Sequence, residues 1–201
     1  MAYASRVIAD LPLFPLPSVL FPGADLQLRI FEQRYMSMLT ECSKDGCGFG
    51  VCLMLDGHEV GSPALPAAVG TLACISDFYT LPDGLLGIGV TGTQRFQVIS
   101  SRIRDDGLIR GRVRLWETEP EQALPPEFGL LATILERLIE QLDGPWRNAD
   151  HACFDDASWV GMRLAELLPL PPHERQHLLE LTDPDERLAD LRDLLPRFQT
   201  P

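Results

Sequence analysis

The stretch DLPLFPLPSVLFPGADLQLRIFEQRY, residues 10–35, decides the fold of this chain. Its first half holds four prolines, which exclude a helix because proline lacks the backbone N–H that a helix needs. The same lack keeps proline out of central strands, so this half predicts an extended segment at the edge of a sheet. The four are Pro12, Pro15, Pro17 and Pro22.

The second half of the stretch predicts a turn, a strand and the start of a helix. Pro22-Gly23 is a turn signal. Apolar and polar residues then alternate over 26–30, which is typical of a half-buried strand. We expect a helix from about Glu32 to Lys44.

The remaining residues up to 118 predict further strands. Asp-Gly at 106–107 supplies the positive φ that a tight hairpin needs, and similar turn signals separate the other apolar runs. The expected strands are Gly48–Leu55, Val69–Tyr79, Leu85–Val90, Phe96–Arg104 and Leu108–Trp116.

A shift in composition at residues 117–126 marks the start of a helical region. The last of its helices is the best specified, because Asp183 can cap it and Pro184 suits its first position. We therefore expect a β-rich subdomain at 1–118 and a helical subdomain at 119–201. The expected helices are 130–142, Ser158–Leu168, Pro172–Leu181 and Pro184–Leu195.

Three groups of motifs, taken in order, resemble the N-terminal, substrate-binding domain of Lon proteases. The opening stretch has that family's PLFPL, LFPG and LRIFE-x-RY elements, with Gln33 where proline is frequent. Gly92–Val98 resembles its G-x-x-R-F-x-V strand. Arg175 opens a segment that resembles its Lys-Gln-x-Leu-Leu-Glu, and a Glu-Arg-Leu follows. The resemblance extends from residue 10 to about 195.

The resemblance implies an α+β fold, with a PUA-like, β-rich pseudo-barrel and one helix followed by a C-terminal helical bundle. It also implies a stand-alone bacterial module that binds unfolded or extended polypeptide segments of other proteins. Binding would use apolar contact and pairing at a sheet edge.

We expect no enzyme activity and no cofactor. The chain has no G-x-x-x-x-G-K-[ST] phosphate loop. Its single lysine, Lys44, stands between Ser43 and Asp45, whereas a catalytic lysine needs a buried setting that lowers its pKa.

Six residues of the matching motifs are candidates for peptide contact. For those in the opening stretch a structural role is favoured, in which they fix a strand-to-helix junction and Arg29 pairs with a carboxylate. The candidates are Arg29, Glu32, Arg34, Tyr35, Arg95 and Phe96.

His173-Glu174-Arg175-Gln176-His177 is a literal H-E-x-x-H motif. On a helix its two histidines could bind zinc, with Glu174 as general base of a metallohydrolase. A surface helical turn is favoured instead, because His173 falls in the first turn and the middle pair is polar. We therefore expect no metal.

Residues 87–92 form a literal G-x-G-x-x-G. A dinucleotide site needs a helix directly after the glycines, but the β-branched and aromatic run TQRFQVIS follows. A glycine-rich strand that another backbone approaches closely is the favoured interpretation.

Five arginines alternate across the predicted hairpin and could share one face of the sheet. They suggest an alternative function as a PUA-like RNA-binding protein, although a solvated face is favoured. They are Arg102, Arg104, Arg110, Arg112 and Arg114.

Charge and composition limit the partners. Residues 1–118 hold 10 basic and 12 acidic side chains, net −2, and residues 119–201 hold 7 and 17, net −10. So acidic a chain is a poor nucleic-acid binder.

The chain has no apolar run long enough for a membrane span, and we expect no secretory signal. Its five cysteines suit free thiols in the cytoplasm, and a homo-oligomer is left open.

Overall fold

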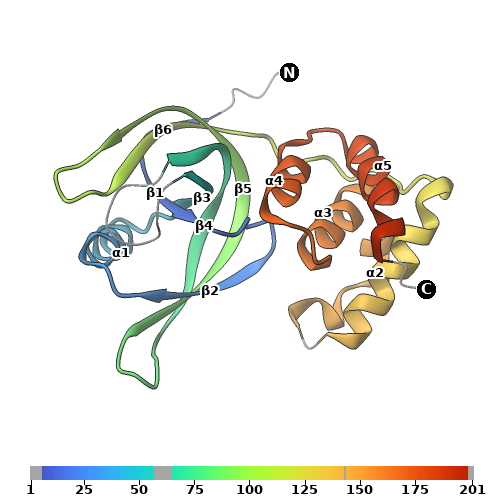
Figure 1. Cartoon of the computed structure of the whole chain (residues 1–201), viewed down its shortest axis with the longest axis horizontal. Coiled ribbons are helices and arrows are strands. Elements are labelled where there is room, and N and C mark those ends of the chain that lie inside the picture. The colour runs from blue at the N-terminus through green and yellow to red at the C-terminus, as the bar shows by residue number, and fades with distance from the viewer. Residues whose placement is uncertain (1–5, 57–64, 143, 199–201) are drawn as a thin grey trace. The chain divides into compact units, whose positions relative to one another are not determined.

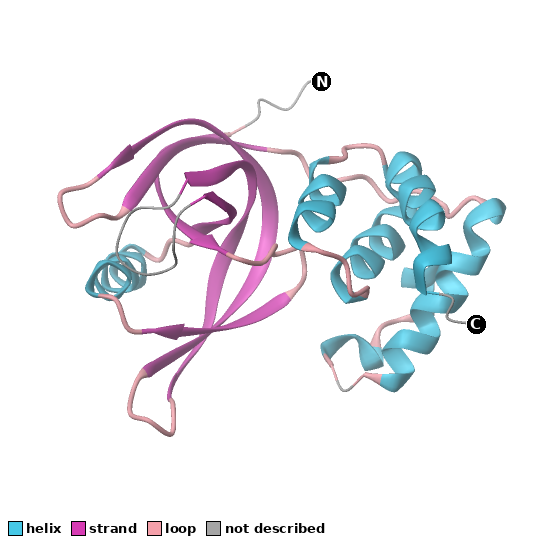
Figure 2. Ribbon diagram, in the orientation of Figure 1, coloured by secondary structure: helices cyan, strands magenta, loops and turns pink. Residues whose placement is uncertain are grey.

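The computed structural model describes residues 6–56, 65–142 and 144–198. The chain divides into two compact units, Met1–Thr118 and Glu119–Pro201. We call them the barrel unit and the helical unit and describe each by itself. Strands dominate the first and helices the second (Figures 1 and 2), so the fold class is α+β as the sequence predicted.

Within its described residues, the barrel unit contains six strands and one α-helix. The helix, α1 (Gln33–Asp45), ends at Gly46, whose φ of 61° suits glycine. The strands are β1 (Val7–Leu16), β2 (Asp25–Ile30), β3 (Phe49–Asp56), β4 (Leu65–Thr80), β5 (Leu86–Ile103) and β6 (Ile109–Leu115).

Five of the six strands close a ring in the order β5-β4-β3-β1-β6, because β6 pairs with both β1 and β5. The length of β5 allows this closure. Its first part, Leu86–Thr91, pairs with β2, and its second part, Phe96–Ile103, pairs with β6. The sequence predicted two strands here, but one strand runs through because pairing with β4 continues at Gly92.

The prediction that the proline-rich segment lies at a sheet edge is wrong. β1 lies inside the ring, antiparallel to β6 and parallel to β3. It changes partner at Leu13, which pairs with both neighbours, whereas Pro12 pairs only with β6 and Pro15 only with β3. At Pro12 and at Pro15, β1 pairs with a strand on one side only. The N–H group that each proline lacks is therefore not needed, although β1 as a whole has two neighbours.

The turn after β1 is fixed against β5. The backbone of Gly92 exchanges hydrogen bonds with Gly23 and Ala24, each 2.8 Å long. A Cβ at Gly92 would lie 2.4 Å from the carbonyl oxygen of Phe21, so only glycine fits. The G-x-G-x-x-G motif is therefore part of a strand that another backbone approaches closely, as the favoured interpretation held.

Strict alternation along β6 builds one wall of the barrel core. Residues 109, 111, 113 and 115 are buried, and the arginines between them point outward. Burial of each large apolar side chain stabilises the fold by about 1.5–3 kcal/mol. The core cluster consists of Leu11, Leu13, Cys52, Phe96, Ile109, Val113 and Leu115.

The described part of the helical unit contains four α-helices, and two short 3₁₀ turns lie between the first and the second. Asp183 caps the last of them through a hydrogen bond from the backbone N–H of Asp185, 2.9 Å long, as predicted. The helices are α2 (Gly129–Gln141), α3 (Ala157–Leu167), α4 (Pro172–Glu180) and α5 (Pro184–Leu194).

Two buried arginines hold the helical unit together. Arg187 is fully buried, and it donates hydrogen bonds to the carboxylate of Glu119 and to the carbonyl oxygens of Leu178 and Leu181. Arg163 is 1% exposed and lies over the ring of Trp146, 4.2 Å from its centroid. Because a guanidinium has several donors and a flat face, both can be buried with partners.

Candidate functional site

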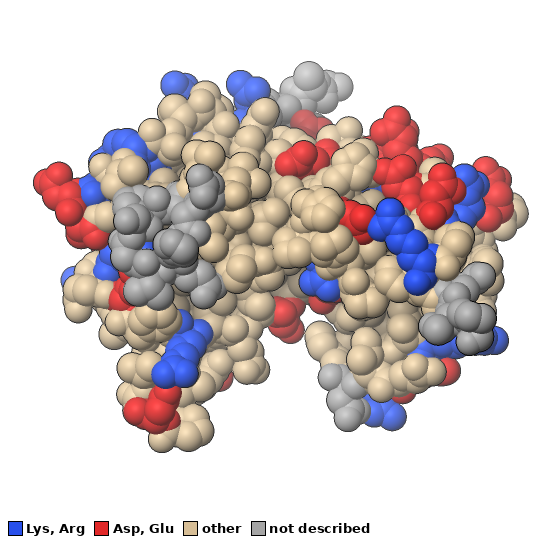
Figure 3. All heavy atoms as spheres, viewed as in Figure 1, with Lys and Arg blue, Asp and Glu red and all other residues tan. Residues whose placement is uncertain are grey.

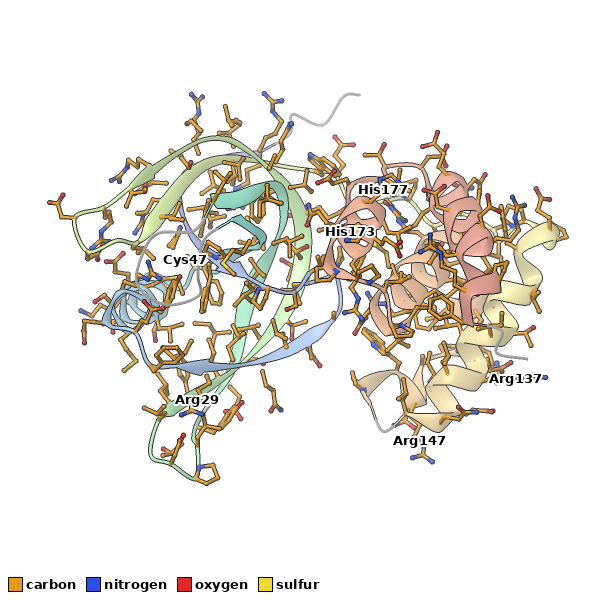
Figure 4. The ribbon with its side chains drawn as sticks, viewed as in Figure 1. Arg29, Cys47, Arg137, Arg147, His173 and His177 are labelled. Atoms are coloured by element: carbon orange, nitrogen blue, oxygen red, sulfur yellow. The ribbon has the colours of Figure 1, made fainter. Side chains whose placement is uncertain are left out.

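The candidate residues of the opening stretch lie at the junction between β2 and α1. Arg29, on β2, pairs with Asp83 at 2.6 Å, and their side chains are 59% and 44% exposed. Figure 4 labels Arg29 beside the loop that joins β4 and β5. Glu32 is the residue before α1, and its carboxylate pairs with Arg34 at 3.0 Å.

Arg34 and Tyr35 are buried, each only 7% exposed. Arg34 donates a hydrogen bond of 3.3 Å to the carbonyl oxygen of Gly107, and its guanidinium lies over the ring of Tyr35. The Tyr35 ring stacks on Phe14 with centroids 3.9 Å apart. The two side chains thus connect the first turn of α1 with β1 and with the β5–β6 turn.

Arg95 and Phe96 are buried as well, at 5% and 0% exposure. The guanidinium of Arg95 lies 4.8 Å from the centroid of the Trp116 ring, and Phe96 belongs to the barrel core. Four of the six candidates are therefore interior residues, which agrees with the junction role favoured for Arg34 and Tyr35 and leaves Arg95 and Phe96 little surface for direct peptide contact. Two arginines and a tyrosine look like surface residues in the sequence, but here the arginines stack on aromatic rings.

The H-E-x-x-H segment lies on α4, with His173 and His177 exposed on one helix (Figure 4). Its members have separate partners. His177 Nε2 lies 2.8 Å from a carboxylate oxygen of Asp190, and Glu174 pairs with Arg197. Over the described ranges, no three His, Cys, Asp or Glu side chains are grouped so as to hold a metal ion.

Three of the five hairpin arginines bind carboxylates of their own unit. Arg104 and Arg110 donate to the two oxygens of Glu41 on α1, at 2.7 and 2.6 Å, and Arg102 pairs with Asp10. The hydrogen bond from Arg104 is the main cause that lowers the pKa of Glu41 below 4.5. Much of the hairpin's positive charge is thus compensated within the barrel unit.

Figure 3 shows the same pattern on the visible face, where basic and acidic atoms lie next to one another at the hairpin tips of the barrel unit. Acidic atoms gather over parts of the helical unit, as its net charge of −10 requires.

β2 provides the candidate binding edge. Among the described strands it alone has one strand neighbour, since it pairs only with β5, from Asp25 opposite Thr91 to Ile30 opposite Leu86. Residues 25–29 alternate between exposed and half-buried, Ile30 is buried, and Phe31, directly after the strand, is 53% exposed. An unpaired strand edge with an exposed aromatic ring can accept an extended peptide as an additional strand.

The sequence did contain a signal for this edge. β2 is short and carries the charged side chains of Asp25 and Arg29 on its exposed positions, both of which are common devices of edge strands. The proline-rich segment gave the stronger signal and directed the prediction to β1.

The described residues thus form a small closed barrel that a helical unit follows in sequence, and β2 is the one described strand with a single neighbour. Residues 10–197 match the family model of the ATP-dependent protease La (LON) substrate-binding domain. The chain therefore belongs to the Lon substrate-binding domain family.

Individual relatives agree with this assignment. A Lon protease from Xanthomonas oryzae pv. oryzae is 29% identical over 97% of this chain and 24% of its own length. Lon protease 2 from Herpetosiphon aurantiacus is 30% identical over 92% of this chain and 23% of its own length. The chain thus spans about a quarter of these curated relatives.

Solved structures agree as well. The crystal structure of a Lon N-terminal domain protein from Xanthomonas campestris matches with a TM-score of 0.78 and 46% identity, over 92% of this chain and 98% of that one. The N-terminal domain of a Mycobacterium avium complex Lon protease shares the fold, with a TM-score of 0.64 at 19% identity. None of the helices in the described part of the chain is long and apolar enough to cross a membrane.

Proposed function

We propose that this chain is a non-catalytic recognition module that binds unfolded or extended segments of other proteins along the free edge of β2. The observation that carries the proposal is the single-sided pairing of β2 in a barrel whose other strands all have two neighbours among the described residues. Membership of a substrate-binding family supports polypeptide as the ligand.

The mechanism is strand addition. The outer backbone N–H and C=O groups of β2 would bond to a peptide main chain, so binding would depend little on peptide sequence. Phe31 would add apolar contact at the end of the edge, and Arg29 with Glu32 would form its polar rim. Arg34, Tyr35, Arg95 and Phe96 would act indirectly, because they hold the junction and the core.

Two peptides of one sequence test this mechanism. The first is an unmodified extended peptide, and the second carries N-methyl groups at alternate residues, which remove its main-chain donors on one side. We expect the first to bind and to protect the amides of β2 from hydrogen exchange, and the second to lose binding. Equal affinity for both peptides, or protection elsewhere only, would exclude strand addition.

A matched pair of variants tests the position of the site. Phe31→Ala should weaken peptide binding, whereas Phe198→Ala, at an exposed phenylalanine of the helical unit, should leave it unchanged. Unfolded and native forms of one model protein should then differ in affinity, with the unfolded form bound without ATP and without cleavage.

We place the chain in the cytoplasm, because no two of its five cysteines are joined in the structure. The proposal gives no role to nucleic acid, since Arg102, Arg104 and Arg110 are paired with carboxylates of the barrel unit. Filter binding at physiological salt should detect no sub-micromolar RNA affinity.

A further inference from the structure

The end of helix α1 brings two cysteines together. Gly46 is in the left-handed conformation, and the backbone N–H of Cys47 donates a hydrogen bond of 3.1 Å to the carbonyl oxygen of Cys42. This is the six-to-one bond of a Schellman motif, in which the side chains of the two bonded residues commonly contact each other. In this chain both positions are cysteine.

The same backbone bond fixes the distance between them. A hydrogen bond of 3.1 Å between the two residues keeps their Cα atoms close to the range of about 4.4–6.8 Å that a disulfide spans. The Cys42 thiol also donates a hydrogen bond of 3.6 Å to the carbonyl oxygen of Gly48, the residue after Cys47.

Cys42 and Cys47 are both among the residues that line a cavity of about 290 Å³ beside α1, which Cys74 and Phe78 of β4 also line. Cys47 is exposed, and Figure 4 shows it near α1, whereas Cys42 is 1% exposed. Of the two cysteines, the exposed Cys47 is therefore the one that a small solute in this cavity can meet directly.

We infer that Cys42 and Cys47 form a site at which a hydroperoxide is reduced and the two thiols are joined in an intrachain disulfide. Cys47 is the thiol that meets the peroxide, and Cys42 is the resolving thiol. Nothing in this inference depends on the binding edge of β2.

The chemistry balances in two steps. The Cys47 sulfur attacks one peroxide oxygen, the O–O bond breaks, and Cys47 becomes a sulfenic acid while water or an alcohol leaves. The Cys42 sulfur then attacks the Cys47 sulfur, and the S–O bond breaks. The departing hydroxide takes the Cys42 proton as water. The two thiols lose two electrons, and the peroxide gains them.

The surroundings of Cys42 affect the rate of the second step. Burial and the neighbouring Cys47 together raise the pKa of Cys42 to about 12. Cys42 is therefore a thiol at neutral pH, and because the thiolate is the attacking form, its proton must leave as its sulfur attacks, which slows this step. Cys52 has a pKa raised to about 12 by burial alone and lies in the barrel core, so it serves as a control.

The sequence makes the product easy to identify. Lys44 lies between the two cysteines, and the next basic residue is Arg95, so trypsin places Cys42 in peptide 35–44 and Cys47 in peptide 45–95. After treatment of the reduced full chain with hydrogen peroxide, we expect a mass loss of two hydrogens. Non-reducing digestion should then give these two peptides linked.

Variants locate the bond, because peptide 45–95 also contains Cys52 and Cys74. The link should persist in Cys52→Ser and in Cys74→Ser and vanish in Cys47→Ser, which alters only an exposed side chain. In Cys42→Ser, Cys47 should remain a sulfenic acid that dimedone traps. A link that Cys74→Ser abolishes, a link only between chains, or an unmodified Cys47 would overturn the inference.

Discussion

Arg187 and Glu119 form a two-pronged ion pair inside the helical unit, with Nη1 at 2.9 Å from Oε2 and Nη2 at 2.6 Å from Oε1. The side chain of Arg187 is 0% exposed and that of Glu119 is 8% exposed. Ser158 donates a further short hydrogen bond to the same carboxylate. The first residue of the unit is thereby attached to α3 and α5.

Glu119→Gln should therefore destabilise the helical unit strongly. Loss of one partner leaves a buried charge without compensation, which costs about 3–5 kcal/mol. Urea unfolding followed by helical circular dichroism measures the loss.

Asp83→Asn provides the control, since it breaks the exposed pair with Arg29, and such pairs contribute about 0.2–1 kcal/mol. Equal effects of the two variants would contradict the structural role of the buried pair.

Gly92→Ala should destabilise the barrel unit by about 1–3 kcal/mol, because the added Cβ would meet the Phe21 carbonyl oxygen at 2.4 Å and force the turn away from β5. Gly129→Ala is the matched control, since a Cβ there meets nothing within 4 Å and the residue begins α2. Thermal unfolding should show a lowered midpoint for the first variant and an unchanged or raised one for the second.

Glu41 should give the barrel unit a pH-dependent stability. Its pKa is lowered in the folded state, first by the hydrogen bond from Arg104, so folding favours its ionised form. This stabilisation is complete above the ordinary pKa of 4.5 and is lost as the pH falls through the lower, folded-state value.

The comparison of the parent chain with Glu41→Gln measures this contribution. The unfolding midpoints of the two should differ at neutral pH and converge as the pH falls below about 4.5. A difference that is constant from neutral pH into the acid range would show that Glu41 acts by packing alone.

Metal removal should leave the protein unchanged. His177 pairs with Asp190, and Glu174 pairs with Arg197, so these side chains of α4 do not form a zinc site. Dialysis against a chelator should alter neither the unfolding midpoint nor peptide binding. About one zinc per chain that His177→Ala removes would reverse this conclusion and restore the metallohydrolase alternative.

Local sequence patterns predicted most helices and strands, but they did not predict which strands pair with each other. The Asp183 cap, the α1 helix and the alternation of β6 depend on residues close in sequence, and all are present. The position of β1 within the ring depends on β6, about a hundred residues away, which no local pattern reveals.

The burial of the candidate arginines also depends on tertiary contacts. A sequence shows that Arg34 and Arg95 are charged, but it does not show that Tyr35 and Trp116 offer them aromatic faces. The binding edge was likewise assigned by proline content, whereas the actual edge follows from which strand is left over when the ring closes.

The pairing of β1 with β6 also governs when the barrel can form during synthesis. Val7 pairs with Arg114, and the backbone N–H of Leu115 bonds to the carbonyl oxygen of Arg6, so the first and last strands of the unit hold each other. A nascent chain that has reached only the β5–β6 turn contains five strands and an open ring. At that stage β6 is missing, so β1 and the second part of β5 each lack one strand partner. The ribosome must therefore release nearly the whole barrel unit before its core can close.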